Sequence, residues 1–567
     1  MPDTIVTRFI DRASSDPVRH AFFIYPMGAL HSLSRLTWGD WITESRSVGG
    51  ALLSLHAAKG DRVAIFSDSR ALWPVAAMGV MMCGLVPVAI HPLSTADALV
   101  ARITECGASI VMVDTIARFK LLRSIQASLP HHITIVCDDL EPLRTSIAEG
   151  VYEFESWCKA GAKALDEFEA LRNRLNERIE SVSAADSAFT TYASGHSASA
   201  DCRAITLTQE NLVATTAAIV STFSLTFSDR VSSYKALDEP FEFALAICAT
   251  IFSGHFTTLL EHGSDAFSAT RQFEASVFSG APRAFDRVRE AFDKARETGS
   301  YLRDTACELL GRHCRLAILT GQVLPEQLHR DLRSGGVALA TVYGSAQQSC
   351  IAVNGLSGFD DSAIGFPFAG VQWRADEHDN LMVRRSPLTF AEYRGDVRSD
   401  DADDASWFST GDRVVATDAG SYRISGYTRD LLKFEDGRYL APGGIETALS
   451  ALPLVAHAVC HTDGRNVIVA VLSLDRQAVE AWAHQQGVAM PWDALVALPL
   501  VYDELARGVA KINARHDIPE RVVAFAPTDL EFTVDNGELN DAGEVVRPVI
   551  ASRFRHIFAD LHQQAQS

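Results

Sequence analysis

The strongest constraint on the fold is an alternation of short apolar runs with helical patterns in the first quarter of the chain. Runs at 62–66, 86–90, 109–113 and 133–137 have the length of buried strands, and the segments between them are typical of helices. Strands that alternate with helices pack as a parallel sheet covered by helices. The sequence therefore predicts α/β layers.

The chain has 567 residues, which is too long for one hydrophobic core, so two or more domains are expected. Its hydrophobic share of 47% and charged share of 22% are ordinary for a globular protein. The net charge of -20 disfavours nucleic acid as a partner, because phosphate binding requires a basic surface. The same charge disfavours docking on an anionic membrane.

Three features bear on the compartment. The ten cysteines form no C-x-x-C pair and most lie in apolar runs, which predicts buried free thiols in a reducing environment. The first 17 residues have no apolar core, so no signal peptide is expected. The longest apolar run, 75–90, is short for a membrane span and is better explained as a buried helix and strand. Together they predict a cytoplasmic protein without a transmembrane segment.

The stretch from Trp407 to Glu446 has the pattern of a junction between two bodies. It begins with a turn that contains an acid at 410–412 and continues as a hairpin whose turn lies at 418–420. A glycine-containing run at 442–444 then precedes a helix start. About 400 residues precede the stretch and about 120 follow it. We therefore expect it to join a large body to a small domain.

This stretch resembles the hinge region of the acyl-adenylate-forming enzymes, the AMP-dependent synthetases and ligases, and within them the long-chain fatty acyl-CoA synthetases. The segments WFSTGD and APGGIE carry the resemblance. Further matches, among them LTQENL at 207–212, IGFP at 364–367 and the last motif, FTVDNGELNDAGEVVR at 532–547, extend from about residue 37 to 555. The resemblance implies an α/β adenylate-forming fold. A large N-terminal AMP-binding domain, 1–425, would hold two α/β subdomains and a β-rich subdomain, and 426–567 would be a small mobile α/β lid.

The resemblance also implies an ATP site built from several segments. Small residues in a loop let backbone N–H groups surround phosphates, and a basic side chain adds charge. A carboxylate such as that of Asp412 accepts hydrogen bonds from the two ribose hydroxyls. Without its flanks, however, the run ASGHSASA is only a polar linker. The implied nucleotide-binding residues are Ser194, Gly195, Arg203, Tyr343, Gly344, Asp412, Tyr427 and, at the hinge, Arg429.

The chain departs from the family pattern where the family does its chemistry. Glu544 stands at the position of the catalytic lysine, and Gln347 at that of the glutamate that binds Mg²⁺. Glu239 replaces a histidine that borders the acyl site in the family, and Tyr427 replaces an arginine near the ribose. Adenylation accumulates negative charge, so the loss of cations predicts impaired catalysis.

Three functions are consistent with this pattern. The first, which the resemblance favours as the ancestral reaction, converts a medium or long-chain fatty acid to acyl-AMP and then to a thioester, using ATP, Mg²⁺ and CoA. Lys235 or Lys433 would then replace lost catalytic groups, although each is more simply a surface residue. The second is a pseudoenzyme that binds an acyl group, a nucleotide or a partner protein. The third is ATP-independent transfer from an acyl thioester. An acyl carrier protein is an alternative acceptor to CoA.

Overall fold

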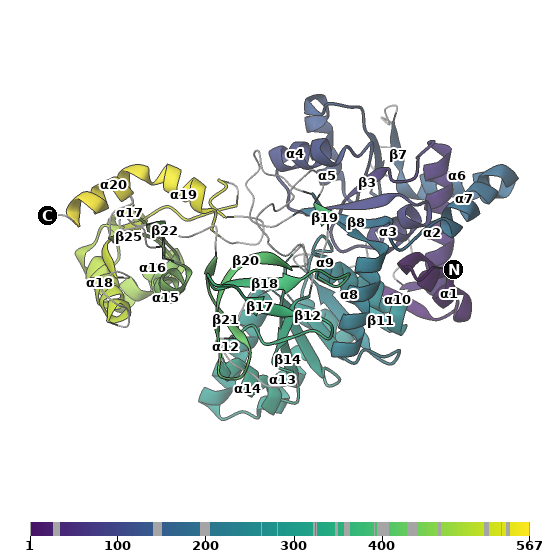
Figure 1. The fold of residues 1–567 in the computed structure, drawn as a ribbon. Helices are drawn as coiled ribbons and strands as arrows, with labels where there is room; N and C mark the ends of the chain where they lie inside the picture. Colours follow the sequence, from purple (N-terminus) through teal and green to yellow (C-terminus); the bar gives the residue numbers. More distant parts are fainter. Residues whose placement is uncertain are drawn as a thin grey trace. The chain divides into compact units, whose positions relative to one another are not determined.

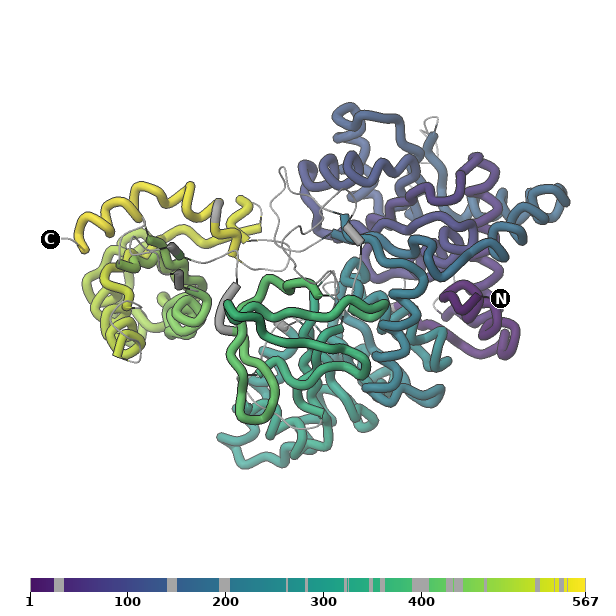
Figure 2. Tube along the Cα trace, in the orientation of Figure 1, coloured from purple at the N-terminus to yellow at the C-terminus, as the bar shows by residue number. Residues whose placement is uncertain are grey.

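The computed structural model describes residues 2–25, 35–139, 150–192, 204–261, 264–280, 282–320, 324, 326–345, 350–356, 363–389, 392–393, 407–427, 432–433, 439–440, 442–462, 467–514, 521–534, 536–539 and 545–565. The chain divides into two compact units, each described here by itself (Figure 1). The first spans Met1–Ala193, Ser199–Trp373 and Val383–Phe408, and the second spans Ser194–Ala198, Arg374–Met382 and Ser409–Ser567. Figure 2 traces the chain through both. The predicted boundary between 425 and 426 stays a prediction.

An eight-stranded sheet in the first unit confirms the predicted α/β layers. Its order is β19-β9-β8-β4-β3-β5-β6-β7, and the run from β8 to β7 is parallel. Its strands are β3 (Arg62–Phe66), β4 (Val86–Ile90), β5 (Ile110–Val113), β6 (Thr134–Cys137), β7 (Val151–Glu153), β8 (Ser187–Tyr192), β9 (Ala204–Thr208) and β19 (Glu392–Tyr393). Four of them match the apolar runs identified from the sequence.

Alternate residues of the central strands face two separate cores. Val63 and Ile65 belong to one hydrophobic cluster, and Ala64 and Phe66 belong to the other. Successive side chains of a strand point to opposite faces, so a strand covered on both faces is apolar throughout. The covering helices are α2 (Trp38–Ser54) and α3 (Leu72–Met82) in the first cluster, and α4 (Ala96–Cys106) and α5 (Ile116–Ile125) in the second.

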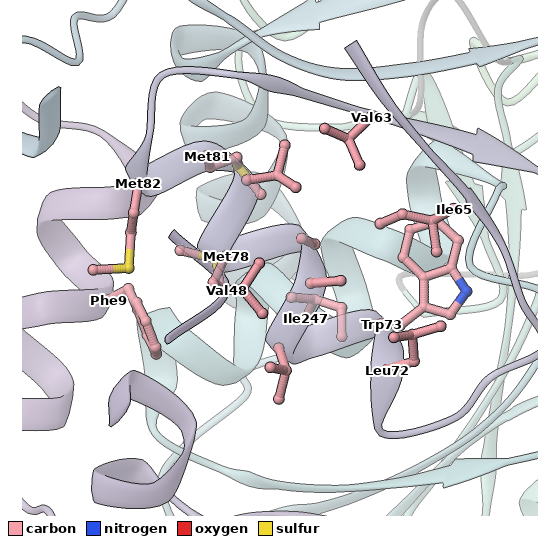
Figure 3. Packing of buried hydrophobic residues seen from close by; sticks show 14 of the residues in the cluster. Phe9, Val48, Val63, Ile65, Leu72, Trp73, Met78, Met81, Met82 and Ile247 are labelled. Atoms are coloured by element: carbon pink, nitrogen blue, oxygen red, sulfur yellow. The ribbon is translucent and has the colours of Figure 1, made fainter. Parts of the chain in front are cut away.

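The first of these cores is dense in large side chains (Figure 3). Trp73 lies beside Ile65 and Leu72 in this view. Trp41 is fully buried, and its indole Nε1 donates a hydrogen bond to the carbonyl of Pro74 at 2.7 Å. A buried tryptophan normally finds such a partner for its N–H group, which here ties α2 to α3.

The sequence of 138–185 is rich in charged residues and only weakly periodic, which predicts a connecting helix with loops, and this prediction is wrong. The described part contains β7 and two helices, α6 (Phe154–Glu167) and α7 (Glu169–Glu180). Helix α6 packs closely against α2, because a Cβ on Gly161 would lie 2.2 Å from the carbonyl oxygen of Ser47. Gly161 lies on the buried face of α6 but is not hydrophobic. The pattern of apolar residues that indicates a helix is therefore weak in this segment.

The second sheet of the first unit has nine strands, in the order β16-β15-β14-β13-β12-β10-β11-β1-β2. The six strands from β14 to β1 in this order are parallel. The strands are β1 (His20–Tyr25), β2 (Arg35–Thr37), β10 (Arg230–Tyr234), β11 (Phe256–Leu260), β12 (Val277–Gly280), β13 (Leu316–Thr320), β14 (Ala338–Tyr343), β15 (Ala352–Asn354) and β16 (Phe366–Pro367). The helices that accompany it are α1 (Ile5–Ser15), α8 (Gln209–Thr222), α9 (Pro240–Phe243), α10 (Ala249–Ser253), α11 (Ala266–Gln272), α12 (Pro282–Thr298), α13 (Leu302–Leu310) and α14 (Glu326–Ser334).

A charged network joins the two sheets at their carboxyl ends. Arg70, in the loop after β3, donates to Glu261, which follows β11, with an Nε–Oε1 distance of 2.7 Å. The Arg70 guanidinium also lies 3.5 Å from Asp114, which follows β5. Arg118 binds both oxygens of Asp114 at 2.7 Å. Asp114 is fully buried, and these two cations compensate its burial by pairing with it.

Asp138, which follows β6, lies near this network but is poorly compensated. Its side chain is buried, and its Oδ2 has no hydrogen-bond partner among the described residues. Burial raises its pKa to about 7, while the charge of Arg70 opposes the rise. In the unfolded chain this carboxyl loses its proton near pH 4. Between about pH 4 and about pH 7, roughly three pH units, only the folded state therefore holds the proton.

We therefore expect Asp138 to destabilise the fold progressively as pH rises from about 4 to about 7, by up to about 4 kcal/mol, with no further change above. Asp138→Asn should gain stability relative to the natural chain at pH 8 and little at pH 4.5. Urea unfolding followed by tryptophan fluorescence at both pH values measures the difference. Asp166→Asn, an exposed acid on α6, is the control. An equal effect of Asp138→Asn at both pH values would contradict the assignment.

The second unit contains the C-terminal α/β region. Its three-stranded sheet has the order β24-β25-β26, with β25 antiparallel to β24 and parallel to β26. The strands that follow β16 are β17 (Trp373–Ala375), β18 (Asn380–Arg384), β20 (Trp407–Ala416), β21 (Tyr422–Tyr427), β22 (Leu432–Lys433), β23 (Tyr439–Leu440), β24 (Val455–His461), β25 (Ile468–Leu474) and β26 (Val522–Thr528). The helices are α15 (Gly443–Ser450), α16 (Arg476–Gln485), α17 (Trp492–Val496), α18 (Pro499–Asn513), α19 (Arg547–Arg553) and α20 (Arg555–Gln564).

The hairpin of the junction stretch is confirmed, but the turn predicted at 410–412 is wrong. Strand β20 runs through these residues and pairs with β21 across the predicted turn at 418–420. Gly411 adopts a positive φ of 86° inside the strand, and the register shifts between Arg413 and Val414. A glycine inside a strand often marks such an irregularity, and its local sequence signature is the same as that of a turn.

The prediction that the cysteines are buried free thiols is confirmed for the described residues. All nine described cysteines are free and eight are buried, with Cys307 partly exposed. Burial raises the pKa of the Cys83 thiol to about 12, so this thiol is not an activated nucleophile. The apolar run 75–90 belongs to α3 and β4. Within the described part of the chain, no helix has the length and apolar character needed to cross a bilayer.

Candidate active site

The carboxyl ends of four parallel strands of the nine-stranded sheet form one edge. β10, β12, β13 and β14 end at Tyr234, Gly280, Thr320 and Tyr343, and their registers place these ends side by side. Open α/β sheets bind ligands outside the carboxyl ends of their strands. A ligand-binding site is therefore expected at this edge.

Lys235 directly follows β10 at this edge. Its side chain is only 7% exposed, and its ammonium contacts both the carboxylate of Glu239 and the hydroxyl of Thr320. The hydroxyl of Thr320 also lies 3.3 Å from Oε2 of Glu239. The Glu239 side chain is 45% exposed. A buried cation and a half-exposed anion thus form a pair at the end of the sheet.

The segment that carries this pair is anchored to the other sheet. Ser69, in the loop after β3, donates a hydrogen bond to the backbone carbonyl of Lys235 at 2.9 Å. Thr191, near the end of β8, donates to the backbone carbonyl of Asp238 at 2.6 Å. Both anchors come from carboxyl ends of the eight-stranded sheet. The segment 235–239 therefore lies where the carboxyl edges of both sheets meet.

Glu242 supports this edge from within. It is fully buried on α9 and accepts hydrogen bonds from Ser233 on β10 at 2.5 Å and from Ser279 on β12 at 2.8 Å. Burial raises the pKa of Glu242, while the charge of Lys235 and the two hydroxyls oppose the rise. Both of its oxygens are thus used to hold the two strands together.

The structure brings some of the predicted site residues to this edge. Glu239 precedes α9, Tyr343 ends β14 half-buried, and Gly344 follows it exposed. In the second unit, Asp412 on β20 is the backbone partner of Tyr427 on β21. The remaining predicted residues lie outside the described residues; they are Ser194, Gly195, Arg203, Gln347, Arg429 and Glu544. Their roles stay predictions, as does the role of Lys433, of which only the backbone is described.

Sequence reasoning did not identify the Lys235–Glu239 pair or the hydroxyls around it. The four-residue spacing of the two charges was a weak signal, because charged residues four positions apart are common on helices. Thr320, Ser233 and Ser279 come from three separate strands, so only the sheet order brings them together. Among the described residues, no group of three or more His, Cys, Asp and Glu side chains is placed to hold a metal ion.

Comparison with known proteins identifies the class. The model of the AMP-binding enzyme family matches residues 9–385, so the chain belongs to that family. This places the protein in the acyl-adenylate-forming superfamily and confirms both the resemblance and the fold predicted from the sequence.

The relatives place the chain near the fatty acyl-CoA synthetases. It is 23% identical over 564 residues to the long-chain-fatty-acid–CoA ligase FadD15 of Mycobacterium bovis, covering 92% of this chain and 91% of that protein. It is also 23% identical over 603 residues to long chain acyl-CoA synthetase 8 of Arabidopsis thaliana, covering 93% and 82%. The solved anthranilate CoA ligase AuaEII in complex with anthranoyl-AMP has the same fold, with a TM-score of 0.70, 17% identity and 98% coverage of both chains.

Proposed function

We propose that this protein binds a fatty acid or a related carboxylic acid at the edge that carries Lys235, and that it is an acyl-CoA synthetase-like ligase whose ATP-dependent activation step is slow. The observation that carries the proposal is the near full-length similarity to a long-chain-fatty-acid–CoA ligase, which covers 92% of this chain. ATP with Mg²⁺ would form the acyl-adenylate, and CoA would accept the acyl group.

The slow step follows from charge at the positions that differ from the family pattern. Adenylation brings a carboxylate against a triphosphate, and cations must neutralise the negative charge of the transition state. Losing one preorganised donor of this kind costs about 10²–10³ in rate. Glu544 at the lysine position also adds repulsion, and Gln347 removes one negative charge that would hold Mg²⁺.

The lid is part of the same proposal. Residues 426–567 would move about the hinge at Arg429 between adenylate formation and thioester formation, as domain closure commonly completes a catalytic site. A cytoplasmic location and an acyl carrier protein as acceptor remain predictions from the sequence.

Two alternatives keep the acyl site but not the ligase reaction. The first is a pseudoenzyme that binds acyl groups or nucleotides, which the substitutions at 347 and 544 favour. The second is transfer from an acyl thioester without ATP. Fold likeness alone decides between none of them, since one fold hosts many functions.

The test supplies the purified protein with Mg-ATP, CoA and a panel of fatty and aryl acids, and measures AMP and acyl-CoA over time. We expect slow formation of both that requires ATP. A parallel reaction with acyl-CoA and no ATP tests the transfer alternative. Acid binding without any AMP would instead support the pseudoenzyme, and no binding of any acid would contradict the proposal.

A further inference from the structure

We propose that Lys235 is the group that binds the carboxylate of the acid, and that Glu239 is a built-in counter-ion which this carboxylate displaces. The inference deepens the proposed function and rests on its acid-binding part. Its ligand class is an acyl chain that ends in a free carboxylate.

The Lys235 cation is buried. A lysine ammonium that is only 7% exposed at the side-chain level requires a counter-charge, because an unpaired buried ion is costly. Glu239 supplies that charge, and Thr320 supplies a further oxygen. The cation is therefore paired and held in place before any ligand arrives.

The two members of the pair differ in exposure and in how firmly they are held. The backbone carbonyl of Lys235 is fixed by Ser69, and its side chain is enclosed. The Glu239 side chain is 45% exposed, and it does not cap the helix that starts after it. Its carboxylate can turn into water and keep its hydration, whereas the lysine cannot leave. The anion is thus the exchangeable member.

Two other acids lie close to Lys235 in the chain, and neither takes the place of Glu239. Glu242 is near enough for the lysine charge to act on it, but both its oxygens accept hydrogen bonds from Ser233 and Ser279. Asp238 is the next acid along the chain, and burial raises its pKa. Neither holds the hydrogen-bonding position beside Lys235 that Glu239 holds among the described residues.

The exchange conserves the ion pair. A substrate carboxylate has the same charge and the same oxygen geometry as Glu239, so it can take over the contacts with Lys235 and Thr320 while Glu239 moves to solvent. The favourable free energy of binding then comes from burying the acyl chain. An alcohol, an amide or a thioester cannot replace the charge of Glu239, so the site should select free acids over neutral analogues.

The test is equilibrium binding without ATP. Dodecanoate and hexadecanoate are titrated by calorimetry beside 1-dodecanol as the neutral probe, against the natural chain, Glu239→Gln and Lys235→Met. A charge-assisted hydrogen bond contributes enough for a change of about tenfold or more. Glu239→Gln should bind the acids about tenfold more tightly because the competitor is gone. Lys235→Met should bind them about tenfold more weakly and lose the preference for acid over alcohol.

Lys235→Arg tests the charge with the shape changed and should keep the preference for acids. Lys294→Met, an exposed lysine on α12, is the matched control and should behave as the natural chain. Unchanged acid binding in both Lys235→Met and Glu239→Gln, or no acid binding by the natural chain, would overturn the inference. Acid binding that depends on Lys235 in a protein that forms no acyl-adenylate would support it while refuting the ligase function.

Discussion

Exchanging Glu544 for lysine and Gln347 for glutamate together should raise the rate of acyl-adenylate formation by at least about 10²–10³-fold. The lysine removes a repulsive charge and supplies the cation that the family places at this position. The glutamate supplies a carboxylate oxygen, the ligand that Mg²⁺ prefers. The measurement is the initial rate of acyl-AMP formation by mass spectrometry, with fatty acid and Mg-ATP and without CoA.

Glu531→Lys is the matched control for this gain. It makes the same change of charge at an exposed acid of the same unit, directly before the segment that carries Glu544, and should leave the rate unchanged. Glu544→Lys alone should give part of the gain. If the doubly changed protein folds, binds the acid and still shows no gain, the assignment of these two positions is wrong.

Arg547→Met should destabilise the C-terminal part of the second unit by about 3–5 kcal/mol, the usual cost of leaving one member of a buried ion pair alone. The Arg547 guanidinium on α19 binds the carboxylate of Glu446 on α15 through two bonds, at 2.8 and 2.6 Å. Arg547 also donates to the backbone carbonyl of Cys460 at 2.9 Å, and the Cys460 amide donates to Glu446 at 2.6 Å. Without the arginine, the Glu446 charge remains mostly buried.

Hydrogen exchange across residues 442–565 measures this effect locally. Protection of α15 and β24 should fall, whereas Arg555→Met, an exposed arginine on α20, should leave it unchanged. The double change Arg547→Met with Glu446→Met should recover much of the loss, because no charge is then left unpaired. Equal loss in the single and double variants would instead point to packing of the arginine stem.

Several matches to the family pattern turn out to be structural contacts. Glu446 belongs to the segment APGGIE, and Arg547 to the last motif, about a hundred residues later, and the two form one ion pair. Thr208 and Asn211 of the segment LTQENL form the capping box of α8. The capping residues could be identified from the sequence because a helix cap is a local task that few residue types perform.

Close backbone approach explains another match. Gly365 in the segment IGFP has a φ of 92°, and a Cβ there would lie 2.1 Å from the carbonyl oxygen of Val353. The sequence indicated the segment but not the reason, because the neighbour comes from another strand. The eight-stranded sheet was predictable for the opposite reason, since fully buried strands between helices leave continuous apolar runs.

The candidate site was less predictable than the fold. Glu239 was singled out only as a substitution, and its function depends on Lys235 and Thr320, which the sheet order brings to it. The turn expected at 410–412 failed because a glycine inside a strand has the same local signature as a glycine in a turn. Where a role depends on contacts between distant strands, the sequence shows the residues but does not show that they come into contact.

The most direct test of the central claim is the turnover number of the natural protein with Mg-ATP, CoA and its best-bound fatty acid, measured as acyl-CoA by mass spectrometry. Enzymes typically turn over at about 10 s⁻¹. A loss of at least about 10² from the missing cations predicts a value below about 0.1 s⁻¹. A turnover near 10 s⁻¹ would contradict the account, because it would mean that other groups, such as Lys235, perform the catalysis that the family assigns to the changed positions.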